Sequence, residues 1–351
     1  MQPCERPFVT VIVPCRDERS WVGACLESIL ASDYPPARME VVVADGMSRD
    51  GTRGIIESYA TQDQRVRLID NPERITPVAL NRAVEAARGE IIVRVDAHAE
   101  VAPEYLRRAV DYLEATGADN VGGAMRTVPR DRGPFAEPIC IVLTHPLGVG
   151  NSRFRTGSDR PRWVDTVFGG CWRRQVFDRV GKFNEKLVRS QDMEFNVRLR
   201  RAGGKILLAP DLEARYYARA TLAAFWRHNW INGVWAVLPF AYSDVVPVRW
   251  RHLAPLAFVF ALAASVLGWS AGWFPGEAPA AVAGPYGATI LAASAAVALR
   301  ERKVTLALVL PATFASLHLG YGAGSLWGAV RLAGIQSRKF IGWLRAKGER
   351  R

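Results

Sequence analysis

The sequence contains few cysteines, and they are scattered. The five thiols are odd in number and show no paired spacing of the kind that zinc ligands have: Cys4, Cys15, Cys25, Cys140 and Cys171. This pattern argues against a disulfide framework or a cysteine-based metal site, and it is typical of reduced thiols in a cytoplasmic domain. The first apolar run, residues 8–13, is also too short for a signal peptide, and we expect a β-strand there instead.

Glycines are missing where a dinucleotide-binding fold needs them. Such a fold has GxGxxG directly after its first strand, whereas PCRDE follows the first strand here. The net charge of +12 does not indicate nucleic acid, because the arginines are dispersed along the chain. Next to apolar stretches, basic residues more often serve an anionic membrane surface or phosphate-bearing substrates. We therefore expect no nucleic-acid partner.

Charge is also scarce in the last third of the chain. Residues 1–218 mix charges with short apolar runs, as a soluble catalytic domain does, and 219–250 combine Trp, Phe and basic residues like an interfacial linker. The segment 251–330 has long uncharged stretches, and 331–351 form a basic amphipathic tail. Stretches 253–275 and 279–299 are long enough to span a bilayer. The third, 304–330, contains Pro311 and a glycine-rich segment, and either spans or is re-entrant.

The first half of the chain alternates strand-like and helix-like segments. Strand-like runs at 8–13, 39–44, 66–70 and 90–95 are separated by helix-like runs at 20–31, 52–60 and 77–88. This order predicts an α/β fold with a mostly parallel sheet, which binds its ligand at the carboxyl ends of the strands.

Acidic motifs occupy three of those strand ends. PCRDE, ADGMSRDGT and DAHAE would surround one cleft, and this favours a phosphate ligand held through a divalent cation. Arg74 and Arg126 could add direct charge to a diphosphate. The alternative for the second motif is that Asp45, Ser48 and Asp50 only cap a turn and the helix after it.

The motif RVDAHAEV carries the most specific chemistry. In an extended backbone, period-two alternation places Asp96, His98 and Glu100 on the same side, where they could converge on one cation.

The motifs together resemble family 2 glycosyltransferases of the GT-A fold. The resemblance runs through VTVIVPCRDE, VVVADGMSRDGT, ALNRAVEAARGEIIVRVDAHAE and VFGGCWRRQVFDRVGKFNEKLVRSQDMEF, and covers roughly residues 8–215. RVDAHAEV, LGVGNSRFR, QDMEF and the apolar carboxyl-terminal region look most like succinoglycan-type glucosyltransferases that extend lipid-linked sugars. Because these proteins carry several carboxyl-terminal spans, the resemblance favours a third span over a re-entrant segment.

The resemblance implies roles for individual residues. The nucleotide pocket would be lined by Pro14, Arg16 and Glu18, the base contacted by Asp45, and the nucleotide approached by Arg74 and Asn81. Asp96 takes the first place of the family's DxD motif and His98 the second, where aspartate is more usual. Glu100 stands where relatives often have a further metal ligand. The histidine favours Mn²⁺ over Mg²⁺, or else His98 hydrogen-bonds the diphosphate without binding metal.

Asp192, in SQDMEF, takes the place of the family's catalytic base, although Gln191 precedes it where glutamate is common. Asp192 and Glu194 are two apart, so on a helix they diverge and only one should face the cleft. Without the resemblance, Asp192 would be an ordinary helix N-cap.

These observations predict an inverting, metal-dependent enzyme. It would move a hexose, glucose from UDP-glucose, to a hydroxyl of a polyprenyl-diphosphate-linked saccharide, alone or with other polysaccharide-assembly proteins. We expect a multi-pass protein of the inner cell membrane with a cytoplasmic catalytic domain. The alternatives are transfer to polyprenyl monophosphate, which needs no base, and a non-catalytic scaffold that binds nucleotide sugars. A processive synthase is disfavoured because QxxRW is missing.

Overall fold

A computed structural model of the chain describes residues 6–348. Its contacts divide the chain into two compact units: Met1–Val128 with Asn151–Tyr217, and Pro129–Gly150 with Ala218–Arg351. The first unit ends one residue before the predicted boundary at 218. The segment Pro129–Gly150 nevertheless belongs with the carboxyl-terminal helices, because its apolar helix α5 (Ala136–Thr144) packs against α14 (Val304–Gly348). Cys4 and the last three residues of the predicted tail lie outside the described residues.

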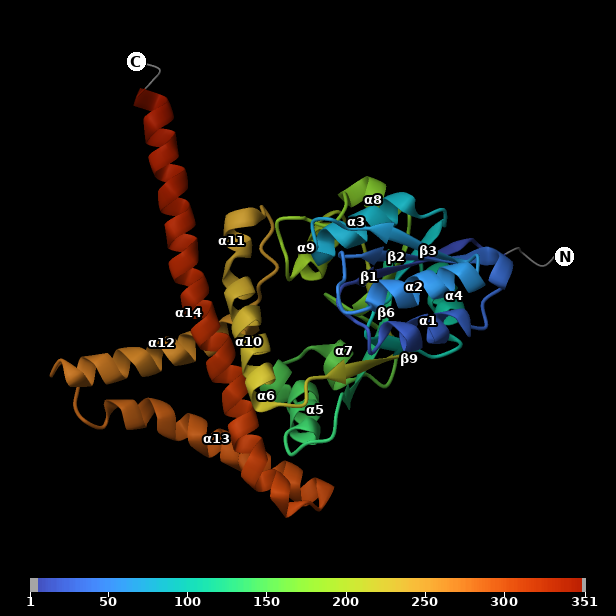
Figure 1. Ribbon diagram of the computed structural model, residues 1–351. Helices are drawn as coiled ribbons and strands as arrows, with labels where there is room; N and C mark the ends of the chain where they lie inside the picture. Colours follow the sequence, from blue (N-terminus) through green and yellow to red (C-terminus); the bar gives the residue numbers. More distant parts are fainter. Residues whose placement is uncertain (1–5, 349–351) are drawn as a thin grey trace. The chain divides into compact units, whose positions relative to one another are not determined.

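The first unit is built on one mixed sheet (Figure 1). Nine strands of the described residues take part, in the order β3-β2-β1-β4-β8-β6-β9-β5, with β7 beside β9. They are β1 (Val9–Cys15), β2 (Met39–Asp45), β3 (Val66–Asp70), β4 (Ile91–Arg94), β5 (Ala99–Val101), β6 (Asn120–Pro129), β7 (Arg162–Trp163), β8 (Phe168–Arg173) and β9 (Ile206–Ala218).

Strands β1 to β4 confirm the predicted parallel arrangement. β1 lies between β2 and β4, and β2 pairs with β3, all in parallel register, whereas β8 runs antiparallel to β4 and β6. Their Val and Ile side chains suit a pleated surface that is buried on both faces. The carboxyl ends of β1, β2 and β4 therefore meet at one edge of the sheet, as the placement of the acidic motifs requires.

Alternation along these strands divides the core into two layers. Val11, Val13 and Val41 point to one face, against α1 (Val22–Leu30) and α4 (Tyr105–Thr116). Ile12 and Val42 point to the other, against α3 (Thr76–Ala86), α8 (Gln175–Val180) and α9 (Gln191–Arg201). The unit also contains α2 (Thr52–Gln62), α7 (Arg153–Thr156) and the 3-10 turn η1 (Pro36–Arg38). The buried faces fix the sheet, and the loops at its carboxyl edge remain available for function.

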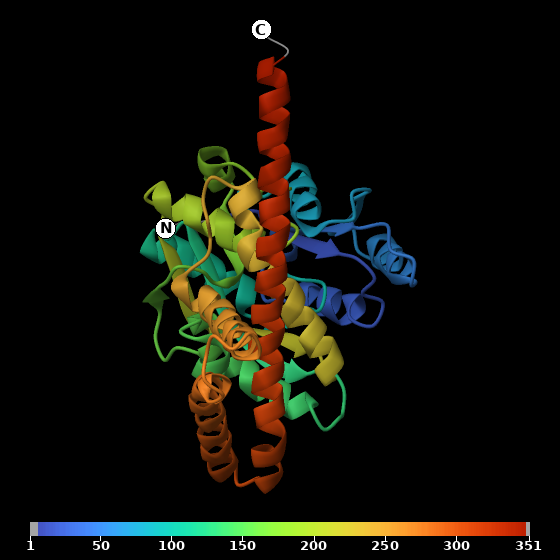
Figure 2. The same ribbon diagram turned by 90° about the vertical axis from the view of Figure 1, so that its left-hand side faces the viewer.

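The second unit is helical (Figure 2). Besides α5 and α14 it contains α6 (Pro146–Val149), α10 (Leu222–Val237), α11 (Pro239–Tyr242), α12 (Trp250–Ser270) and α13 (Ala278–Glu301). Helices α12, α13 and α14 are long and apolar enough to cross a membrane. The third predicted stretch forms part of one continuous helix, so the re-entrant alternative is wrong.

The glycine-rich segment of α14 is explained by its close packing on α10. A Cβ at Gly324 would lie only 2.1 Å from the carbonyl oxygen of Trp230, and one at Gly233 only 1.9 Å from that of Tyr321. Ser325 also donates a hydrogen bond to the carbonyl oxygen of Gly233, at 3.1 Å. Small residues on both helices thus let two backbones approach more closely than larger side chains would permit.

Candidate functional site

The loops after β1 and β2 are tied together into one wall of the site. Three backbone N–H groups of the first loop donate to side-chain oxygens of the second: Asp17 to Ser48 (2.9 Å), Glu18 to Thr52 (2.8 Å) and Arg19 to Asp50 (3.1 Å). In the reverse direction, the backbone N–H of Arg49 donates to the side chain of Asp17 at 3.0 Å. Asp50 also accepts from the backbone and hydroxyl of Thr52, at 3.0 and 2.5 Å, at the start of α2. Asp50 therefore binds the first residue of α2, although the N-cap position itself is Gly51 and carries no side-chain cap.

The side chain of Asp45 forms hydrogen bonds within the turn that follows β2. Its side chain is fully buried and accepts from the backbone N–H and hydroxyl of Ser48, at 3.2 and 2.5 Å, and from Arg53, at 3.4 Å. The turn alternative accounts for each of these contacts. Contact between Asp45 and a nucleotide base stays a prediction.

Arg16 and Arg74 lie side by side at the same edge. A guanidinium nitrogen of Arg16 donates to the carbonyl oxygen of Arg74 at 3.1 Å, and the backbone of Arg74 has a positive φ of 59°. Both side chains are exposed, so they are accessible to a phosphate or a nucleotide. Pro14, at the end of β1, pairs in register with Ala44 beside them.

Asn81 lies on α3 but turns toward the segment before α9. Its amide donates to the carbonyl oxygen of Phe183 (2.9 Å) and to Glu185 (2.8 Å), and its oxygen accepts from the N–H of Phe183 (2.9 Å). The side chain is thus committed to a structural turn. Its approach to the nucleotide stays a prediction.

The expectation that Asp96, His98 and Glu100 share one side of an extended strand is wrong. β4 ends at Arg94, and the N–H of Ala99 donates to the carbonyl oxygen of Asp96 at 2.8 Å, closing a turn. β5 then pairs with β9. Because the backbone turns between the two strands, the period of two does not hold across the motif.

Asp96 is held by Arg94. The Nε and Nη2 atoms of Arg94 both contact Oδ1 of Asp96, at 2.9 and 2.8 Å, and the two side chains are 9% and 17% exposed. Burial tends to raise the pKa of the Asp96 carboxyl, but the charges of Arg94 and His98 outweigh it, so the pKa lies below its ordinary value. Asp96 is therefore an anion at neutral pH.

His98 and Glu100 point to different partners. Nδ1 of His98 lies 3.0 Å from a carboxylate oxygen of Glu18, and its ring meets that of Tyr216 edge-on at 5.4 Å. Glu100 accepts a 2.5 Å hydrogen bond from Tyr217. Within residues 6–348, no three His, Cys, Asp or Glu side chains are close enough together to hold a metal ion.

The donor set nevertheless fits a divalent cation in part. An ionised carboxylate at Asp96 and an imidazole at His98 are separated by one residue, and a diphosphate could supply the remaining ligands. The hydrogen bond between Glu100 and Tyr217 makes Glu100 the weakest of the three predicted ligands.

Asp192 and Glu194 diverge as expected. Glu194 is buried and pairs with Arg198 one turn later on α9, at 2.9 Å. Asp192 lies in the first turn, where it accepts from the N–H of Met193 at 2.8 Å, and its charge acts on both Arg94 and Arg155. Of the two carboxylates, Asp192 is thus the one whose charge reaches Arg94, next to the DAHAE turn, and its role as a base stays a prediction.

The ion pair of Arg126 does not involve Arg94, Asp96, His98 or Asp192. It lies on β6, is largely exposed, and is 3.9 Å from Glu213 on β9. Its role at a diphosphate stays a prediction.

Sequence reasoning missed Arg94, Arg155 and Tyr216. Arg94 could have been found, because a charged residue at the end of a buried strand needs a partner and Asp96 stands two positions later. Arg155 and Tyr216 come from segments remote in sequence, and no local pattern indicated that they would meet.

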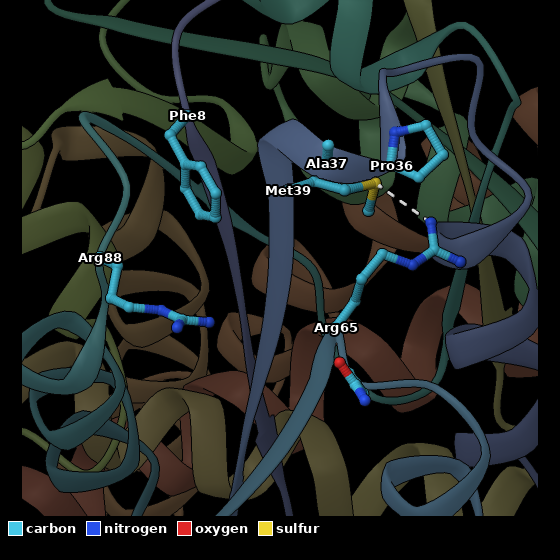
Figure 3. Close-up of a pocket in the computed structure, with 7 residues that line it drawn as sticks. Phe8, Pro36, Ala37, Met39, Arg65 and Arg88 are labelled. Carbon is cyan, nitrogen blue, oxygen red and sulfur yellow. Dashed lines mark hydrogen bonds between the residues drawn. The ribbon is translucent and has the colours of Figure 1, made fainter.

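A hollow of about 460 Å³ lies elsewhere in this unit, at the amino ends of the strands (Figure 3). Phe8 and Met39 line it together with Arg65 and Arg88. Both arginines are already paired, Arg65 with Asp63 and Arg88 with Glu40. The hollow is therefore not a substitute for the site at the carboxyl ends.

Comparison with known proteins assigns the chain to a family. The family model for glycosyl transferase family 2 matches residues 10–181. The succinoglycan biosynthesis protein ExoA of Rhizobium meliloti is 33% identical over 269 residues, covering 70% of this chain and 80% of that protein. Dolichyl N-acetyl-alpha-D-glucosaminyl phosphate 3-beta-D-2,3-diacetamido-2,3-dideoxy-beta-D-glucuronosyltransferase of Methanococcus voltae is 24% identical over 225 residues, covering 62% and 69%.

A solved structure shows the same fold. The mannosyltransferase PcManGT from Pyrobaculum calidifontis, in complex with GDP-Man and Mn²⁺, matches 93% of this chain and 88% of its own, with a TM-score of 0.60 and 24% identity. The mixed sheet with flanking helices is thus the GT-A fold that the sequence predicted. The chain belongs to the family 2 glycosyltransferases and is an enzyme of that family.

Proposed function

We propose that the enzyme is an inverting, metal-dependent glycosyltransferase that moves glucose from UDP-glucose to a hydroxyl of a polyprenyl-diphosphate-linked saccharide. The observation that carries the proposal is the position of Asp192, whose charge acts on Arg94 and Arg155 beside the DAHAE turn. A carboxylate there is suited to take a proton from an acceptor hydroxyl. The relative from Methanococcus voltae, whose name specifies a dolichyl-phosphate-linked sugar as acceptor, supports a hydroxyl acceptor.

The reaction follows from this placement. The acceptor oxygen attacks the anomeric carbon from the face opposite the nucleoside diphosphate, so the bond to the acceptor forms as the bond to the diphosphate breaks. Asp192 takes the acceptor proton. Arg94 keeps Asp96 ionised and oriented, and Arg16 and Arg74 provide positive charge at the nucleotide side of the site.

Asp96 and His98 would hold a divalent ion, Mn²⁺ or Mg²⁺. When bound, it would supply positive charge to the departing diphosphate. The similar structure with Mn²⁺ and GDP-Man supports this assignment for the fold. We further propose that the catalytic unit lies on the cytoplasmic side of the inner membrane, where nucleotide sugars are made, and that its product enters cell-surface polysaccharide.

The decisive experiment is transfer from radiolabelled UDP-glucose by the full-length protein in detergent, comparing wild type with Asp192→Asn. Offered a polyprenyl-diphosphate-linked saccharide, the variant should lose about 10²- to 10⁴-fold in rate while its affinity for UDP is unchanged. Asp159→Asn, at an 84% exposed side chain, is the matched control and should keep full activity. Full-rate transfer by Asp192→Asn, or transfer only into polyprenyl monophosphate, would refute the proposal.

A further inference from the structure

Arg155 carries a positive charge that no ion pair of the described residues neutralises. It lies on α7, which precedes β7 in the sequence. Its Nη1 atom is buried and has no hydrogen-bond partner, and none of the ion pairs of the described residues includes it. A buried polar group of this kind costs free energy unless something binds it.

The contacts of Arg155 are with rings rather than carboxylates. Its guanidinium carbon lies 5.5 Å from the ring centre of Phe154 and 5.9 Å from that of Tyr216. Tyr216 in turn meets His98 edge-on, at 5.4 Å. Burial lowers the pKa of Arg155, and the nearby charges of Tyr216 and Asp192 only partly oppose it. The rings position the guanidinium but do not neutralise it.

We propose that Arg155 binds a phosphoryl oxygen of a substrate in the site that contains Asp192 and His98. Resting on the proposed function, this gives the site an anion-binding group in addition to Arg16 and Arg74, which follow β1 and β3. A planar guanidinium can offer two N–H groups to one phosphate. The phosphoryl group belongs either to the donor's diphosphate or to the acceptor's diphosphate, and binding experiments separate the two.

The test compares Arg155→Gln with Arg153→Gln, which removes an exposed arginine from the same helix. If the donor is bound, Arg155→Gln should weaken UDP binding about 10- to 100-fold in calorimetry and leave UMP almost unchanged. If the acceptor is bound, UDP affinity should stay constant while KM for the lipid-linked acceptor rises by a similar factor. Arg153→Gln should change neither. Unchanged UDP affinity together with unchanged acceptor KM would overturn the proposal.

Thermal unfolding separates this role from a structural one. Because Arg155 has an unpaired buried nitrogen, Arg155→Met should leave Tm unchanged or raise it while it weakens phosphate binding. A fall in Tm without loss of binding would show that Arg155 only packs. The measurement of UDP binding needs no sugar transfer, so it tests Arg155 even if the proposed acceptor is wrong.

A second, independent inference concerns α14 in the helical unit. Its 45 residues extend about 68 Å, more than twice a hydrocarbon core of about 30 Å. In the most apolar window of each helix, 11% of α12 and 17% of α13 is buried, against 44% of α14. α12 and α13 thus expose their apolar surface, whereas much of α14 is covered by protein.

Besides α12 and α13, four helices pack against α14: α5 and α6, of 9 and 4 residues, and α10 and α11, of 16 and 4 residues. Lys303, just before α14, pairs with Glu137 of α5 at 2.6 Å, and His318 lies 3.0 Å from the carbonyl oxygen of Leu147 in α6. Further along, Gly324 abuts α10, and Lys339 donates to the carbonyl oxygen of Ala241 in α11 at 3.0 Å. The segments that join α5 to α6 and α11 to α12 are irregular backbone, which cannot face lipid.

The first turns of α12 pack against the middle of α14. A Cβ at Gly322 would lie 2.3 Å from the carbonyl oxygen of Pro255, in the second turn of α12. From there α12 leaves α14 at a steep angle, and α13 returns toward it (Figures 1 and 2). The level at which α12 would enter a bilayer is therefore the level of the centre of α14.

We propose that only the α12–α13 hairpin crosses the bilayer and that α14 lies along the cytoplasmic membrane surface. Both ends of the hairpin, including Arg300 and Lys303, then stay on the cytoplasmic side. The exposed Arg331, Arg338 and Lys339 face anionic headgroups instead of being translocated, as a third crossing would require. The basic tail no longer conflicts with the positive-inside tendency.

Labelling with a membrane-impermeant maleimide tests this topology. In right-side-out vesicles, Gly276→Cys at the hairpin tip should react and Ser337→Cys on α14 should not; both residues are exposed. In inverted vesicles the pattern should reverse. Asp159→Cys in the catalytic unit reports the cytoplasmic side, and the wild-type protein gives the background of the native thiols. Labelling of Ser337→Cys from outside, or failure to label Gly276→Cys there, would refute the hairpin topology.

Discussion

The buried pair of Arg94 and Asp96 offers a direct test of how the site is held together. Arg94→Gln removes a guanidinium whose two contacts both fall on Oδ1 of Asp96, at 2.9 and 2.8 Å. The carboxylate then stays buried without its partner, which costs about 3–5 kcal/mol. For a unit of about 200 residues, 1 kcal/mol corresponds to about 2–4 °C, so we expect Tm to fall by about 6–20 °C. Tryptophan fluorescence of the full-length protein in detergent reports the transition.

The pH dependence of that loss has a defined sign. In the wild type the pKa of Asp96 lies below its ordinary value, so this carboxyl stabilises the fold above the unfolded-state pKa and ceases to do so as pH falls through the folded-state pKa. In Arg94→Gln burial dominates, and the pKa of Asp96 should rise above the unfolded value. The Tm difference between variant and wild type should therefore be largest near neutral pH and shrink toward about pH 4.

Two further variants decide whether the pair is responsible. Adding Asp96→Asn to Arg94→Gln removes the unpaired charge and should recover part of the lost Tm. Arg108→Gln breaks a half-exposed pair with Asp211 and should cost less than about 1 kcal/mol. Equal losses for Arg94→Gln and Arg108→Gln, or a double variant no more stable than the single one, would refute the reasoning.

Other consequences follow from the packing and the chemistry of the site. Gly324→Ala should lower Tm by forcing α14 from the backbone of Trp230, at a cost of about 1–3 kcal/mol, whereas Gly334→Ala on the same helix, where nothing lies within 4 Å, should be neutral or stabilising. Asn81→Ala should cost about 1–3 kcal/mol by leaving buried groups of Phe183 unpaired, with UDP affinity unchanged; weaker UDP binding at unchanged Tm would instead support the predicted nucleotide role. Chelation with EDTA should abolish transfer, and Mn²⁺ should restore it; full activity in EDTA would exclude a metal-dependent mechanism.

The fold could be predicted well because its signals are local. Val66–Asp70 begins and ends as expected, and β1, β2 and β4 differ from their predicted runs by at most two residues at either end. Each run is rich in Val and Ile, and is followed by a polar motif that cannot continue the strand. The alternating burial of these segments needs no information from distant parts of the chain.

The site was less predictable because its partners are remote in sequence. The sequence indicated the carboxylates but not what each would bind: Glu100 is engaged by Tyr217, His98 by Glu18, and Asn81 by Phe183. The turn after Arg94 also broke the extended geometry on which the metal prediction rested. Such contacts depend on how β9 and the segment before α9 return to the edge of the sheet, and no periodicity encodes that.

The contacts of the two central carboxylates explain why they are suited to different tasks. Asp96 has an oxygen occupied by the guanidinium of Arg94, and a carboxylate so stabilised as an anion is a poor proton acceptor but a good ligand for a cation. The hydrogen bond that Asp192 accepts comes from the backbone of Met193, and no ion pair of the described residues includes it, so its oxygens are available to receive a proton. On the proposed function, different partners for two identical side chains would thus provide a ligand and a base in one site.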